Sequence, residues 1–117
     1  MYSDEDIVRL RSIDKKMDDI FNIIDRHKGI VETLQDIEGQ PAVLMLLVAV
    51  SEQFSKLHKK DSNILNSFEQ IDIKGMIDIR NFIAHDYDGV NLSIIEDSLR
   101  LDLPKIHQIV KDILTQS

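Results

Sequence analysis

The segment from Arg80 to Tyr87 holds the residue types best suited to chemistry in this chain. It places a guanidinium at Arg80, an amide at Asn81, an imidazole at His85 and a phenol at Tyr87. Histidine moves protons near neutral pH, and arginine presents a permanent, forked cation that matches phosphate oxygens. These two groups suit the cleavage of an RNA strand by its own 2′-hydroxyl, a reaction that needs no metal ion. We expect Asn81 to orient His85 or to hydrogen-bond a phosphate oxygen.

The spacing of these residues limits how one helix can use them. At about 100° per residue, Asn81 and His85 share one face, and Arg80 and Tyr87 share a neighbouring face. Arg80 and His85 are then about 140° apart, so one helix aims both at the same atom only if it ends or bends there. Two copies packed about a twofold axis would solve this, because facing Arg80 and His85 pairs could line a shared cleft.

A purely structural role for the same residues remains open. Arg80 could form an ordinary salt bridge, and His85 could be a cation that stabilises the C-terminal end of a helix. The other histidines, His27, His58 and His107, lack partners at metal-ligand spacing, so solvated or capping roles are expected for them. No metal-binding or cofactor-binding residue is predicted.

The first helix that must support this segment is predicted from about Asp4 to about Arg26. Its apolar residues recur at steps of three and four, the spacing that lines one helix face. Ser3 followed by Asp6 resembles a capping box, and acidic residues suit the first turn. Asp18 falls on the polar face and is expected to be solvated.

The remaining elements are also predicted to be helical. A short piece over 30–37 is followed by a break at 38–41, a helix over 42–57 and a polar loop over 58–63. A short element over 64–68 then precedes a helix over 72–87, which ends at Asp88-Gly89. The final helical region starts at Asn91 or Ser93, runs through Leu99 and continues past a kink or restart at Pro104. With short loops and no alternating strands, this order indicates an all-α antiparallel bundle of four to five helices in a single domain over residues 1–117.

The helix predicted over 42–57 begins apolar on almost every side. Such a helix must be covered all round, so one side is expected to face the bundle and the other a second subunit. A buried strand over Val43 to Val50 is the rival interpretation, but no partner strand is evident.

Composition narrows the class of protein. The chain has 117 residues, no cysteine and a net charge of −7, from 21 acidic and 14 basic residues. This charge disfavours a broad nucleic-acid-binding surface, so RNA contacts would have to be few and focused in a cleft. The most apolar run, Ala42 to Val50, is far shorter than the roughly 20 residues of a membrane-spanning helix. No signal peptide is evident, and a cytoplasmic location is expected.

The motif Arg80-Asn81-x-x-x-His85 resembles the Arg-polar-x-x-x-His signature of HEPN ribonucleases. With Tyr87 added, it is similar to the extended form in the HepT toxins of MNT/HEPN modules. The turn at Asp86 to Val90 and the segment Asp102-Leu103-Pro104 also resemble that family's C-terminal half. One departure is that many relatives carry Gly-Glu in the central helix, where this chain has Val50-Ser51-Glu52.

The resemblance implies a homodimer with a composite, metal-independent RNase site. Arg80 and His85 would be catalytic, and Asn81 would support them. It also implies a partner, an MNT nucleotidyltransferase antitoxin that attaches AMP to Tyr87, as in type VII-like toxin–antitoxin systems. The added bulk and negative charge would repel RNA phosphates.

Two functions therefore remain from the sequence. The favoured one is a toxin endoribonuclease that leaves a 2′,3′-cyclic phosphate and is neutralised by AMPylation. The alternative is a non-catalytic HEPN module that presents substrate to a nucleotidyltransferase or scaffolds it. Retention of Arg80, His85 and Tyr87 together favours the first, whereas the acidic net charge favours the second.

Overall fold

The computed structural model describes residues 2–116, and the described chain is entirely helices, turns and loops. In order along the chain, the elements are α1 (Asp4–Arg26), α2 (Ile30–Leu34), α3 (Gly39–Lys59), η1 (Asn63–Phe68), α4 (Ile73–His85), α5 (Leu92–Asp97), η2 (Ser98–Asp102) and α6 (Leu103–Gln116). The predicted all-α antiparallel bundle is confirmed. The rival strand over Val43 to Val50 is wrong, because these residues lie inside α3.

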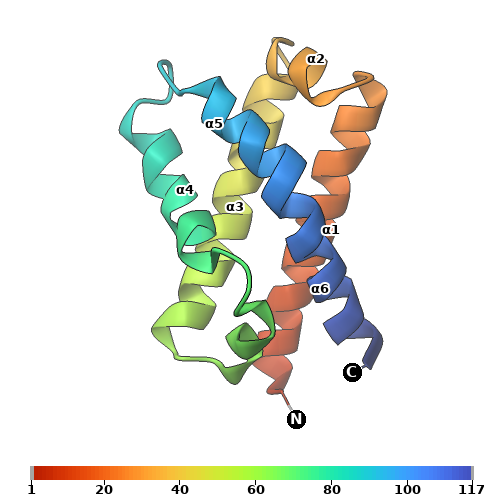
Figure 1. The fold of residues 1–117 in the computed structure, drawn as a ribbon, viewed down its shortest axis with the longest axis vertical. Coiled ribbons are helices and arrows are strands. Elements are labelled where there is room, and N and C mark those ends of the chain that lie inside the picture. Colours follow the sequence, from red (N-terminus) through yellow and green to blue (C-terminus); the bar gives the residue numbers. More distant parts are fainter. Residues whose placement is uncertain (1, 117) are drawn as a thin grey trace.

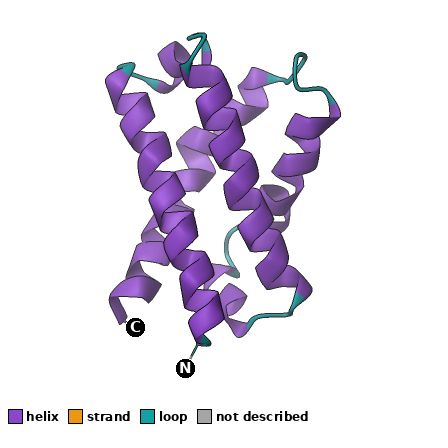
Figure 2. Ribbon diagram, turned by 180° about the vertical axis from the view of Figure 1, so that it is seen from behind, coloured by secondary structure: helices purple, strands orange, loops and turns teal. Residues whose placement is uncertain are grey.

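The long helices run up and down beside one another. In Figure 1, α1 rises from the N-terminus, α3 descends, α4 rises again, and α5 continues through η2 into α6 on the way down. Helix α3 packs against α1 on one side and α4 on the other, and α1 also packs against α6. Figure 2 shows from behind that loops are confined mainly to the bundle ends. Helix α3 is therefore the central support of α4.

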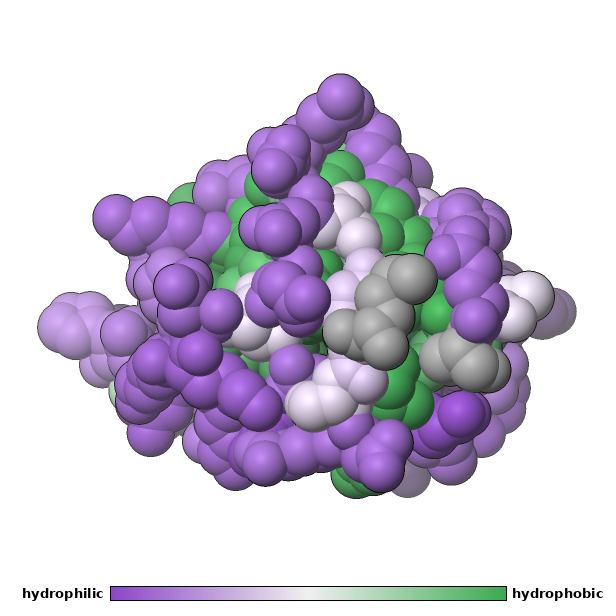
Figure 3. Space-filling model, turned by 90° about the horizontal axis from the view of Figure 1, so that it is seen from below, coloured by the Kyte–Doolittle hydropathy of each residue, from purple (hydrophilic) through white to green (hydrophobic). Residues whose placement is uncertain are grey.

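The core is built from one apolar stripe on each helix. Burying these side chains, at roughly 25 cal/mol per Å² of apolar surface, is the main force that holds the bundle together. Members of the core with no exposed surface include Leu10, Ile13, Met17, Ile20, Leu44, Leu47, Phe54, Ile95 and Ile106. At the end of the molecule that carries the termini, apolar atoms show between rims of polar side chains (Figure 3).

Local capping explains where α1 and α3 begin. The Ser3 hydroxyl accepts a hydrogen bond from the Asp6 N–H at 3.1 Å, so the predicted start and end of α1 are confirmed. Helix α3 begins at Gly39, three residues before the predicted start at Ala42, because the Asp36 carboxylate accepts from the N–H groups of Glu38 and Gly39 at 2.9 and 2.8 Å. The hydrogen bonds from Gly39 and Glu38 also lower the pKa of Asp36.

Pro104 produces a widened turn rather than a break. Proline has no N–H, so the helix interior loses one α-helical hydrogen bond at this position. The five residues Ser98–Asp102 form a π-helical turn instead, closed by the Leu103 N–H donating to the Ser98 carbonyl. The predicted kink or restart is thus a π turn that joins α5 to α6.

Among the described residues, no helix has the length and apolar character needed to cross a membrane.

Candidate active site

Helix α4 fixes the motif residues at the surface. Its first turn is capped by Asp72, whose Oδ1 accepts from the Gly75 N–H at 2.8 Å. Met76, Ile79 and Ile83 bury one face of the helix in the core. The rest of the helix surface is therefore held toward solvent, and all the catalytic candidates, Arg80, Asn81 and His85, are exposed on it.

Arg80 and Asn81 line a hollow of about 500 Å³ between α3 and α4. The buried Ser51 hydroxyl donates to the Ile77 carbonyl at 2.7 Å and so fixes the two helices against each other. The hollow is lined by Ser51, Glu52, Ser55, Lys56 and Lys59 of α3 and by Ile77, Arg80 and Asn81 of α4. Three cations and one carboxylate therefore surround this space.

His85 lines a second hollow of about 540 Å³ at the C-terminal end of α4. Its walls are Asn81, Phe82, His85, Asp86, Gly89, Val90 and Asn91. Asn81 belongs to both hollows, and its Oδ1 accepts from Arg80 Nη1 at 3.3 Å. Arg80 and His85 thus open onto adjoining spaces, and one protomer does not bring both into the same hollow.

Tyr87 lies outside the helix, contrary to the predicted span of 72–87. Helix α4 ends at His85, and Asp86 leaves the helical conformation with φ −150° and ψ 79°. The Asp86 carboxylate accepts from the Gly89 N–H at 3.1 Å and closes a turn, and a Cβ at Gly89 would lie 2.3 Å from Asp86 Oδ2. Tyr87 is 41% exposed in this turn and lines neither hollow.

The α3 side of the site was not predicted from the sequence. Ser51, Glu52, Lys56 and Lys59 lie opposite Arg80, but their proximity depends on how α3 packs against α4. The polar residues at positions 52, 56 and 59 are three and four residues apart, a spacing that predicts one exposed face of a helix. Nothing in this spacing indicated which helix that face would adjoin.

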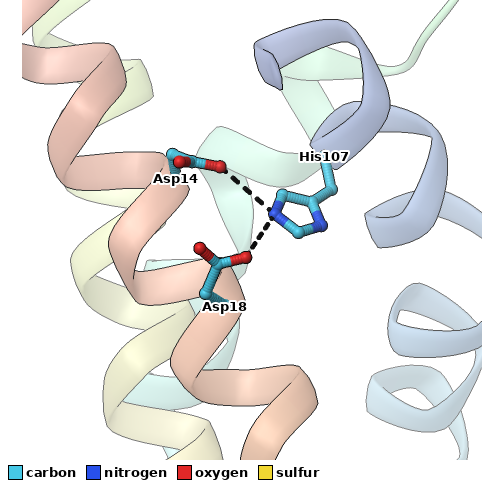
Figure 4. A group of neighbouring side chains, drawn as sticks. All are labelled: Asp14, Asp18 and His107. Atoms are coloured by element: carbon cyan, nitrogen blue, oxygen red, sulfur yellow. Dashed lines mark ion pairs between the residues drawn. The ribbon is translucent and has the colours of Figure 1, made fainter.

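A second polar cluster joins α1 to α6. Asp14 and Asp18 point toward His107 (Figure 4), whose Nε2 lies 3.3 and 3.0 Å from their Oδ1 atoms. These three side chains have the spacing of metal ligands, so the prediction that His107 has no such partners is wrong. However, the Lys111 ammonium lies 2.9 and 3.3 Å from the same two carboxylate oxygens and balances their charge.

This cluster is best described as an ion-pair network. The hydrogen bond from Lys111 to Asp14 raises the pKa of the lysine, and the His107 ring also stacks on Phe21 with centroids 5.2 Å apart. Asp18 is therefore paired and not simply solvated as predicted. The network forms because α1 and α6, distant in sequence, pack side by side.

The other two histidines match the predicted roles. His27 is the C-cap of α1, where its Nδ1 lies 2.8 Å from the Ile23 carbonyl and its Nε2 lies 3.2 Å from Asp36. His58 is exposed near the end of α3. Neither lines the two hollows of α4.

Comparison with known proteins assigns most of the chain to one family. A family model described as Ribonuclease HepT-like matches residues 13–113. A curated protein of Methanocaldococcus jannaschii, named "Putative RNase", is 29% identical over 107 residues, which cover 80% of this chain and 86% of that protein. No solved structure gives a significant match.

Proposed function

Because this chain belongs to the HepT-like ribonuclease family, we propose that it is a metal-independent endoribonuclease whose catalytic residues are Arg80 and His85. The observation that carries this proposal is their placement. Both are exposed on the outer face of α4, at two adjoining hollows that share Asn81. A purely structural arginine or histidine would not need to open onto a hollow.

The proposed reaction is an internal transesterification. The ribose 2′-oxygen attacks the adjacent phosphorus while His85 accepts its proton. A bond forms between the 2′-oxygen and phosphorus, the bond from phosphorus to the 5′-oxygen of the next nucleotide breaks, and this oxygen leaves with a proton taken from water. Arg80 neutralises the charge that grows on the phosphate oxygens. The products are a 2′,3′-cyclic phosphate and a 5′-hydroxyl.

A homodimer would complete this site. One chain aims Arg80 and His85 into separate hollows, so a second copy facing α4 would bring both groups to one cleft.

Regulation is proposed to act through Tyr87. A cognate nucleotidyltransferase of the MNT type would transfer AMP from ATP to the phenol oxygen, with release of pyrophosphate. Tyr87 lies two residues beyond His85 and is exposed, so the added phosphate would bring negative charge beside the RNA path. The pair would form a toxin–antitoxin system in which AMPylation silences the ribonuclease.

Removal of either catalytic group tests the proposal. We expect Arg80→Ala and His85→Ala each to lower RNA cleavage at least about 100-fold, because general acid–base and charge-stabilising groups each contribute that much or more. The matched controls are Arg11→Ala and His58→Ala, which remove exposed cationic or imidazole groups outside both hollows. In cells, the wild type should arrest growth and the two catalytic variants should not.

The acidic net charge of −7 favours a second candidate, a non-catalytic module that presents RNA to a nucleotidyltransferase or scaffolds it. Wild-type protein that leaves RNA intact and growth unaffected without its partner would support this function over the first.

A further inference from the structure

We propose that the groove between α3 and α4 binds the backbone of single-stranded RNA beside the cleavage point, with Lys56 and Lys59 contacting neighbouring phosphates. The groove is the hollow lined by residues 51, 52, 55, 56 and 59 of α3 and by Ile77, Arg80 and Asn81 of α4. This inference rests on the proposed function, since it supplies the path by which a strand reaches Arg80.

The two lysines are cations without a partner in the described chain. The ammonium groups of Lys56 and Lys59 make no ion pair and no hydrogen bond within residues 2–116, and both side chains are exposed. Three other lysines are neutralised within the described chain: Lys15 by Asp19 at 2.7 Å, Lys60 by Asp6 at 2.8 Å and Lys111 by Asp14 at 2.9 Å. In a chain of net charge −7, unneutralised cations beside Arg80 form a local anion-binding surface.

The geometry suits an extended strand. Residues three apart on a helix have Cβ atoms about 5–6 Å apart on one face, so Lys56 and Lys59 can each reach a separate phosphate. Arg80 approaches the same space from the facing helix, and the bond from Ser51 to the Ile77 carbonyl fixes the separation of the two helices. A strand lying along the groove would therefore meet Arg80 and then Asn81, which opens onto the His85 hollow.

The lining favours RNA over an acidic protein segment. Ile77 is the one large apolar side chain on the described walls of this groove, so a partner helix would find few apolar anchors. A phosphate backbone needs no apolar anchors, because a cationic groove that follows the strand attracts its phosphates electrostatically.

Binding of a short fluorescein-labelled oligouridylate, followed by fluorescence anisotropy, tests the proposal. The parent protein carries His85→Ala so that the RNA stays intact. We expect Lys56→Gln and Lys59→Gln each to weaken binding by roughly threefold to tenfold at low salt. The double variant should reduce the steepness of log affinity against log salt concentration by about 1.4, because each lost phosphate contact on a single strand removes about 0.7. The matched control is Lys105→Gln, which removes an exposed lysine of α6 that lines no part of the groove.

Two results would overturn the inference. One is a double variant that binds with the affinity and salt slope of its parent, and the other is a parent that does not bind the oligouridylate. If the wild-type protein cleaves RNA, either result rejects RNA binding by Lys56 and Lys59 but leaves the proposed function standing. A wild-type protein that does not cleave RNA would instead reject the proposed function.

Discussion

The end of α4 separates two proposed roles that lie only two residues apart. His85 is the last helical residue, so the buried Ile83 and Ile79 on the opposite face hold its backbone in place. Tyr87 follows in a turn closed by Asp86 and Gly89. Another enzyme could therefore reach the Tyr87 phenol without unfolding α4, while the imidazole remains positioned for RNA.

The Tyr87 prediction belongs to this residue scale. With ATP and a cognate nucleotidyltransferase, we expect the protein to gain one or more AMP units on Tyr87 and to lose RNA cleavage, as measured by intact and peptide mass spectrometry. Tyr87→Phe should remain unmodified and active. The matched control is Tyr2→Phe, since Tyr2 is the other tyrosine of the chain, and it should be modified like the wild type. Equal labelling of Tyr87→Phe would reject Tyr87 as the target.

At the scale of elements, a buried carboxylate ties the start of α1 to the end of α3. The Asp6 side chain is 5% exposed and accepts hydrogen bonds from Lys60 at 2.8 Å and from the Ser62 hydroxyl. Burial alone would raise the pKa of Asp6, but the hydrogen bonds from Lys60 and Ser62 outweigh it and lower the pKa. The charged form of Asp6 therefore stabilises the fold.

Removing this charge should destabilise the protein in a pH-dependent way. We expect Asp6→Asn to lower the free energy of unfolding by about 1–3 kcal/mol near neutral pH, because hydrogen bonds to a charged group are lost. A lowered pKa in the folded state means that the contribution is present above the unfolded pKa of about 3.9 and is lost as the pH falls below it. The difference between wild type and variant should thus be constant above about pH 5 and shrink below about pH 4.

Urea denaturation across this pH range measures the effect. Asp4→Asn is the matched control, because Asp4 is an exposed carboxylate in the same first turn of α1. A difference between Asp6→Asn and wild type that does not change between pH 6 and pH 3, or a loss no larger than that of Asp4→Asn, would contradict this role for Asp6.

Helices were predictable from the sequence where local patterns decide the structure. The stripe and cap of α1 gave both of its ends, because Ser3 and the apolar periodicity are local signals. The end of α4 was misplaced by two residues, since the Asp86–Gly89 turn competes with a further helical turn. The groove with Lys56 and Lys59 was out of reach, because it exists only once α3 and α4 have packed.

For the whole molecule, the arrangement of charge matters more than its sum. Five basic side chains form ion pairs within the described chain, as Lys111 does in the α1–α6 network, whereas the three cations of the groove, Lys56, Lys59 and Arg80, form none. The sequence singled out the motif residues because four residue types stand at fixed spacing in one short segment, and the structure shows that all four are exposed. Their distribution over two adjoining hollows was not predictable, because it depends on where α4 ends and what packs beside it.

A shared cleft between two protomers is the central claim at this scale, and subunit complementation tests it most directly. Arg80→Ala and His85→Ala proteins are each inactive in the proposed mechanism, yet a mixed dimer would hold one intact Arg80 and one intact His85 across the same cleft. After the two variants are unfolded together and refolded, native mass spectrometry should detect the mixed dimer, and cleavage of labelled RNA should rise well above that of either variant alone. A mixed dimer that forms and remains as inactive as its parents, or a wild type that cleaves RNA as a monomer, would contradict the account.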